Sequence, residues 1–66
     1  MNRDELRAAI ARKNISKKDL AEALGISQGA LYYKLSGQHE FKESEIRVLI
    51  EVLELSADAV NLIFLG

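Results

Sequence analysis

The side chains best suited to recognising another molecule lie together between residues 27 and 33. Gln28 carries an amide that can donate and accept hydrogen bonds at the same time. Tyr32 and Tyr33 are the only tyrosines of the 66-residue chain. Solvent-facing positions of a purely structural helix usually hold Lys, Glu or Gln, so two adjacent exposed tyrosines favour a contact surface over a structural one.

Catalytic chemistry finds little support in the sequence. Ser27 has no partner base and is explained as a helix cap rather than as a nucleophile. The single histidine, His39, stands beside Glu40, and there is neither a second histidine nor any cysteine, so a metal site would lack ligands. A glycine-rich phosphate loop is also absent. We therefore expect no enzymatic activity, no cofactor and no metal, and an imidazole that is exposed to solvent or contacts a phosphate.

The elements that must position these residues are helices. Apolar residues recur at helical spacing along the chain, and there is no proline and no linker-like stretch. We predict an all-α single domain over residues 1–66. Its first helix spans residues 2–13 and is ended by Asn14, and Ser16 caps a short second helix that ends at Leu24.

A sharp turn separates the second helix from the third. Gly25 stands where a left-handed backbone is expected after a helix end. Ser27 is again a good cap, so the third helix begins almost at once and continues to about Ser36, where Gly37 stops it. Helices joined this closely cross steeply, and Ala21 is small where the third helix would press on the second.

The stretch from Ser16 to Gly37 resembles the helix-turn-helix motif of phage lambda-repressor-like, Cro-like and xenobiotic-response-element-type transcriptional regulators. The matching residues are Leu20, Ala21, Gly25, Ile26, Ser27, Leu31, Leu35 and Gly37. Each also has a packing or capping reason to be there, and several matches at the right spacing are more specific than a lone Ala and Gly.

The C-terminal half extends the resemblance. Phe41 precedes a helix opened by Ser44, Glu45 and Ile46, and Ser56 caps a last helix. The resemblance implies a compact five-helix fold in which helices 2 and 3 form the helix-turn-helix. The expected core side chains are Leu6, Ile10, Ile15, Leu20, Leu24, Leu31, Leu35, Ile46, Leu49, Ile50, Leu53, Val60 and Phe64.

In the resembling family the third helix is the recognition helix, whose first residues meet base edges in the major groove of DNA. Leu31 and Leu35 set its buried side, and at 100° per residue Gly29 and Tyr33 lie nearly opposite. Gln28 can read the N6 and N7 atoms of adenine together. For the tyrosines, packing of one ring over Phe41 or the following loop is the alternative. The implied base contacts are Gln28, Gly29, Tyr32 and Tyr33.

Phosphate contacts are expected from the N-terminal ends of the two motif helices, where free backbone amides favour an anion. The expected phosphate-contacting residues are Lys17, Ser27, Lys34, Gln38 and Lys42. Three further basic residues are expected to be merely solvated: Arg12, Lys13 and Lys18.

The charge distribution is uneven although the net charge is only -1. Residues 1–37 hold seven basic and four acidic residues, and residues 38–66 hold two basic and six acidic residues. This asymmetry is compatible with one phosphate-facing surface. Chance sorting of solvated charges explains it equally well.

The C-terminal helices carry more apolar residues than one core face needs, namely Val48, Val52, Leu62 and Leu65. Such a surplus favours an interface, and the resemblance implies a homodimer on a palindromic site. A tightly wrapped monomer core is the alternative.

These observations lead to a functional expectation. We expect a cytoplasmic phage or prophage regulator of the Cro or repressor type that binds specific sequences of double-stranded DNA, with no membrane segment and no small-molecule ligand, in a complete rather than an excised chain. The main alternative is a helix-turn-helix fold that docks on another protein. Single-strand binding through Tyr32 and Tyr33 is a further alternative, but it lacks the broad basic groove that such proteins use.

Overall fold

The starts of four helices follow from side-chain caps. In the computed structural model, which describes all 66 residues, Asn2, Ser16, Ser27 and Ser56 each accept a hydrogen bond from the backbone N–H three residues later, at 3.0 to 3.1 Å. Each cap satisfies a donor that the first helical turn leaves free. The elements are α1 (Arg3–Lys13), α2 (Lys17–Leu24), α3 (Gln28–Ser36), α4 (Glu43–Val52), α5 (Ala57–Val60) and the π-helical turn η1 (Asn61–Leu65).

The predicted all-helical fold with five helices is confirmed, and no strand is present. The bounds of α1, α2 and α3 agree with the predicted ones to within about a residue. α4 begins at Glu43, slightly earlier than expected, and η1 extends the last helix. The termination at Asn14 is also confirmed, since this residue is left-handed with φ 58°.

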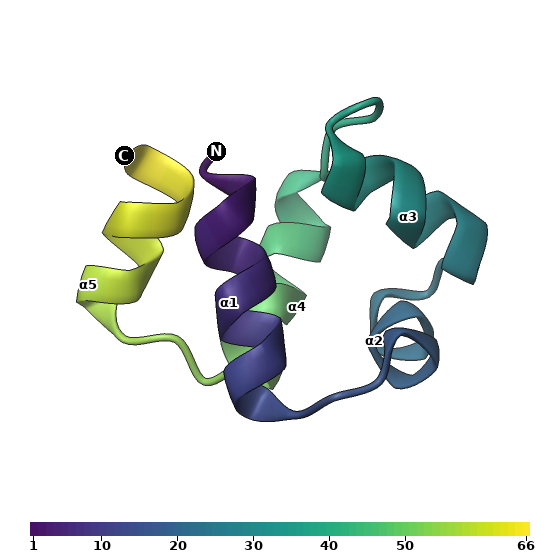
Figure 1. Cartoon of the computed structure of the whole chain (residues 1–66), viewed down its shortest axis with the longest axis horizontal. Helices are drawn as coiled ribbons and strands as arrows, with labels where there is room; N and C mark the ends of the chain where they lie inside the picture. Colours follow the sequence, from purple (N-terminus) through teal and green to yellow (C-terminus); the bar gives the residue numbers. More distant parts are fainter.

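The helices flank α1 on both sides (Figure 1). α4 lies behind α1 in this view, α2 and α3 lie on one side, and α5 with η1 lies on the other. The two chain ends meet, because the Asn2 N–H donates to the Ile63 carbonyl at 2.6 Å. The pair α2 and α3 lies on the side of α1 away from α5 and η1, and the last turn of α3 reaches the start of α1.

The core draws on every element except α5. Its buried apolar side chains are Leu6, Ala9, Ile10, Leu20, Ala21, Leu24, Leu31, Leu35, Phe41, Leu49, Leu53 and Ile63. Five residues expected in the core are only partly buried: Ile15, Ile46, Ile50, Val60 and Phe64. Ile63 is the C-terminal residue that is fully buried instead, because η1 continues the last helix as a wider turn and changes which side chains face inward.

The bend between α2 and α3 is a glycine-dependent helix end. Gly25 is left-handed with φ 71°. Its N–H donates to the Glu22 carbonyl, and the Ile26 N–H donates to the Ala21 carbonyl, each at 3.0 Å. This paired pattern closes a helix and reverses the chain, and a side chain at Gly25 would be strained. The chain thus leaves α2 and enters α3 after only two further residues.

Candidate nucleic-acid interface

One face of α3 is open to solvent along its length. Leu31 and Leu35 are buried, whereas Gln28 and Gly29 are exposed. Tyr32 and Tyr33 retain 65% and 43% of their accessible surface. The structure therefore brings together all four residues predicted to contact bases, on the side of α3 that faces away from the core.

The first turn of α3 presents backbone as well as side chains. The Ser27 hydroxyl oxygen accepts a hydrogen bond from the Ala30 N–H at 3.0 Å, so its capping role is confirmed. A Cβ added to Gly29 would meet only the Ser27 hydroxyl oxygen, at 3.9 Å. The surface over Gly29 is thus bare backbone at a helix N-terminus, where the dipole favours an anionic group.

A groove of about 230 Å³ lies between α2 and α3. It is lined by Lys17, Gln28, Leu31, Tyr32 and Leu35. Lys17 was predicted to contact phosphate and Gln28 to contact a base, so the two expected roles meet at one concavity. A charged residue and an amide beside an apolar floor can engage a polar backbone and a base edge together.

The two tyrosines and His39 form an exposed aromatic cluster. The rings of Tyr32 and Tyr33 are 5.5 Å apart between centroids and nearly edge-on at 74°. Tyr33 lies 5.5 Å from the His39 ring in the loop that follows α3. Packing against the following loop is therefore found for Tyr33, which still leaves it substantially exposed. Phe41 is instead contacted by the Lys34 ammonium, 5.9 Å from its ring centroid.

The structure corrects the assignment of Lys34 as a phosphate contact. This residue was expected at the surface, but it is only 8% exposed, and its Nζ donates to the Glu45 carboxylate at 2.5 Å. Glu45, in α4, is 6% exposed. The aliphatic stem of Lys34 runs inward between α3 and α4, so its charge is neutralised inside the molecule.

The sequence did contain a signal that Glu45 has a buried partner, although not which residue it is. Glu45 precedes Leu49 and Leu53 at intervals of four residues, and both leucines are buried. A carboxylate on the apolar stripe of a helix requires a buried partner, because an unpaired buried charge is very costly. A nearby lysine was the available counterion.

The ion pair sets the charge state of Glu45. Burial by itself raises the pKa of this carboxyl. The hydrogen bond from Lys34 and the hydrogen bond from the Lys42 backbone N–H, at 2.8 Å, stabilise the ionised form, and the charges of both lysines add to this. The net result is a pKa below the ordinary value of 4.5.

The lowered pKa predicts a loss of stability in acid. The unfolded chain binds a proton at Glu45 more readily than the folded one, so the stabilisation is complete above pH 4.5 and is lost as the pH falls through the lower folded-state value. We expect the free energy of unfolding to decline more steeply below pH 4.5 in the wild type than in the double variant Lys34→Met/Glu45→Leu. Urea titrations at several pH values measure this, and parallel pH profiles would contradict it.

Few cations remain free to meet a phosphate. Lys13 pairs with Glu54, and Arg3 and Arg7 donate to carbonyls at the end of α3. The residues expected at phosphates that do lie exposed are Lys17, Ser27, Gln38 and Lys42. Arg12 and Lys18, expected to be solvated, are exposed as well. Of these cations, Lys17 lines the groove between α2 and α3, so exposed positive charge borders the α3 face at its α2 edge.

The expected apolar surplus is smaller than the sequence indicated. Val48 and Val52 are partly buried and pack against the core, which leaves less of their surface for a partner than the sequence suggested. Leu62 and Leu65 are exposed by 50% and 76%. Only the C-terminal turn therefore offers large exposed aliphatic side chains.

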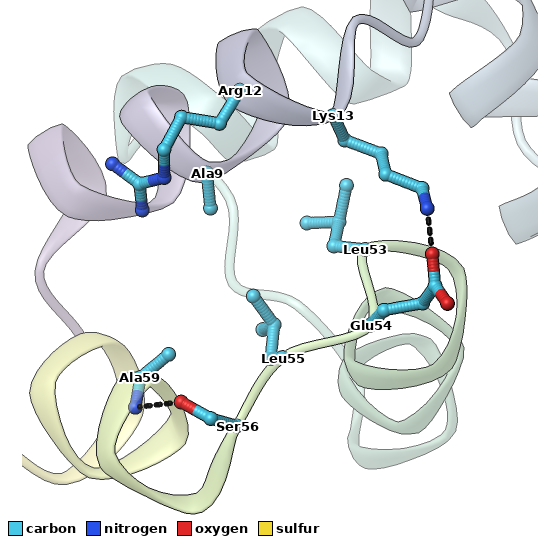
Figure 2. A pocket seen from close by; sticks show the side chains of 8 residues that line it. All are labelled: Ala9, Arg12, Lys13, Leu53, Glu54, Leu55, Ser56 and Ala59. Atoms are coloured by element: carbon cyan, nitrogen blue, oxygen red, sulfur yellow. Dashed lines mark hydrogen bonds and ion pairs between the residues drawn. The ribbon is translucent and has the colours of Figure 1, made fainter.

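A second cleft of about 390 Å³ lies between α1 and the α4–α5 connection (Figure 2). Arg12 and Lys13 stand on its α1 side, Leu53 and Leu55 lie opposite, and the Lys13–Glu54 ion pair crosses one end. None of the α3 residues lines it. Arg12 is therefore an exposed cation outside the α3 face, which makes it a useful reference position.

Two classes of feature are not found. No three His, Cys, Asp or Glu side chains are grouped so that they could hold a metal ion. None of the helices combines the length and apolar character that crossing a membrane requires.

Comparison with known proteins finds a family model and a similar protein, each matching most of the chain. A family model described as a helix-turn-helix domain matches residues 3–63. The chain is also 37% identical over 60 residues to a cyanate hydratase from Photorhabdus laumondii. That match covers 91% of this chain but only 38% of the relative, so the chain spans well under half the length of that protein. No solved structure matches.

Proposed function

The chain belongs to the helix-turn-helix domain family, and from this we propose that it binds double-stranded DNA by placing α3 in the major groove. One observation carries the proposal. Gln28, Tyr32 and Tyr33 are exposed on the single face of α3 that is not used for packing, next to the Lys17 edge of α2. In this mode of docking the first turns of the recognition helix read base edges.

Each group has a distinct role in this proposal. The Gln28 amide pairs with an adenine edge, Gly29 lets the backbone approach closely, and Tyr33 contacts a base methyl or a phosphate. Lys17 and the helix N-termini hold the DNA backbone. We further propose a phage or prophage regulator of the Cro or repressor type, acting without enzymatic activity. It binds a palindromic site as a homodimer through Leu62 and Leu65, and steric exclusion of polymerase makes repression the default.

Selection from a random duplex library tests the proposal directly. The intact chain is incubated with the library at moderate salt, and bound duplexes are amplified and sequenced over several rounds. We expect an enriched motif with two-fold symmetry and half-sites about one helical turn apart. Recovery of unenriched sequences after repeated rounds would rule out sequence-specific binding.

Lys17 should govern the salt dependence of binding. Replacing it by alanine removes about one phosphate contact, and each such contact adds roughly 0.9 to the slope of log affinity against log salt. We expect Lys17→Ala to weaken binding to all duplexes and to reduce this slope by about one unit. Arg12→Ala removes an exposed charge outside the α3 face and should leave the slope nearly unchanged. Equal slopes for the two variants would argue against a phosphate contact at Lys17.

A second candidate function is protein docking through the same α3 face. It is favoured by the similarity to part of a much longer protein named for an enzymatic activity, and by the neutralisation of Lys34, which leaves few cations beside the exposed tyrosines. Exposed tyrosines are enriched at protein interfaces. This candidate predicts no enrichment in the duplex selection, together with a partner whose binding is abolished by Tyr33→Ala.

A further inference from the structure

Two arginines of α1 donate to the last turn of α3. Arg3 Nε donates to the Lys34 carbonyl at 3.1 Å, and Arg7 Nη2 donates to the Leu35 carbonyl at 2.7 Å. The end of a helix leaves such carbonyls without an intrahelical partner. Both guanidinium groups also bring positive charge to the negative end of the α3 dipole. The N-terminal helix therefore completes the C-terminal end of α3.

Arg3 occupies the corner where α3 turns into the following loop. Its side chain is mostly buried, and its Nη2 lies 3.8 Å from the Glu40 carboxylate. A Cβ added to Gly37, whose φ is 94°, would stand 3.5 Å from the Arg3 guanidinium. Arg7 is about half exposed. Its Nη1 also donates to the Asp4 carboxylate at 3.3 Å.

The same turn of α3 is also held by α4. There the Lys34 side chain reaches Glu45 of α4, so both α1 and α4 form hydrogen bonds with the last turn. The outward residue of this turn is Tyr33, which also supports the His39 ring. A change in how the turn is held must change how α3 presents its exposed face.

We propose that Arg3 and Arg7, the arginine clamp, are positioning residues that set the orientation of the α3 face without contacting DNA phosphates themselves. The DNA part of this proposal rests on the proposed function. A guanidinium offers N–H donors in a rigid planar fork, whereas an ammonium is a compact point charge. A clamp should therefore not tolerate lysine, whereas a phosphate contact that needs only a positive charge should.

Variants of Arg7 distinguish a positioning role from a direct phosphate contact. Affinity for the duplex enriched by selection is measured at several salt concentrations for Arg7→Lys and Arg7→Gln, with Arg12→Lys and Arg12→Gln as matched controls. We expect both Arg7 variants to lose affinity, on the order of tenfold, with an unchanged salt slope, and the Arg12 variants to match the wild type. Full affinity in Arg7→Lys with a slope reduced by about 0.9 in Arg7→Gln would overturn the proposal, because that pattern indicates a phosphate contact.

A measurement on the wild-type protein tests the clamp even if the variants do not fold. Its result in the free protein does not depend on DNA binding. In ¹⁵N-labelled protein we expect the Arg7 guanidinium to show separate, slowly rotating Nη signals that do not shift when duplex is added. Averaged signals in the free protein would disprove the clamp. If no duplex binds, the proposed function fails, while the free-protein signals still decide whether the clamp exists.

Discussion

Replacing Glu45 by alanine should lower the free energy of unfolding by about 3 to 5 kcal/mol, because it leaves the Lys34 ammonium buried without a counterion. The change also removes the acceptor for the Lys42 backbone N–H at the start of α4. A domain of this size has a total stability of roughly 3 to 10 kcal/mol. The variant should therefore lose a large share of its stability and unfold at a much lower urea concentration than the wild type, as urea titration followed by circular dichroism would measure.

Two controls make this result specific to the ion pair. Glu51→Ala removes an exposed carboxylate from the same helix and should change stability by about 0.5 kcal/mol or less. The double variant Lys34→Met/Glu45→Leu replaces both charges by apolar side chains and should recover most of the lost stability, since buried pairs are often replaceable in this way. A Glu45→Ala variant as stable as Glu51→Ala would show that the pair is not buried in solution.

Much of the fold was predictable because its signals are local. A cap is decided by one side chain and the backbone three residues on, so Ser16 and Ser27 fixed where α2 and α3 begin. Gly25 and Asn14 adopt left-handed conformations that their residue types tolerate well. The exposed face of α3 was also predictable, because the spacing of Leu31 and Leu35 determines which residues point away from the core.

The partners of the charged residues were not predictable in the same way. Lys34 and Glu45 are 11 residues apart, and Arg7 and the Leu35 carbonyl are 28 apart. Helical periodicity gives the direction in which a side chain leaves its own helix, but it does not give the neighbour that a long flexible side chain meets. The lysines and arginines were therefore counted as surface charge. The Lys34 side chain is instead buried, and Arg3 and Arg7 donate to carbonyls at the end of α3.

This redistribution of charge changes what the α3 face can do. Arg3, Arg7 and Lys34 support the helix, so in the proposed mode of binding the charged phosphate contacts are reduced to Lys17 and Lys42. With few phosphate contacts, non-specific affinity should be low. Discrimination between sequences then depends heavily on base contacts, and the residue best equipped for them is Gln28.

Replacing Gln28 by alanine should relax sequence preference at one base pair of each half-site. A bidentate amide–adenine pair discriminates by roughly 1 to 3 kcal/mol, so binding to the preferred duplex should fall by about five- to 150-fold while binding to a duplex changed at that pair stays nearly constant. Competition binding with matched and substituted duplexes measures both. Asn61→Ala removes an exposed amide from η1, on the opposite side of α1, and should preserve the preference. If Gln28→Ala weakened both duplexes equally, Gln28 would hold the backbone rather than read a base, and the specificity of α3 would have to come from Tyr32 and Tyr33.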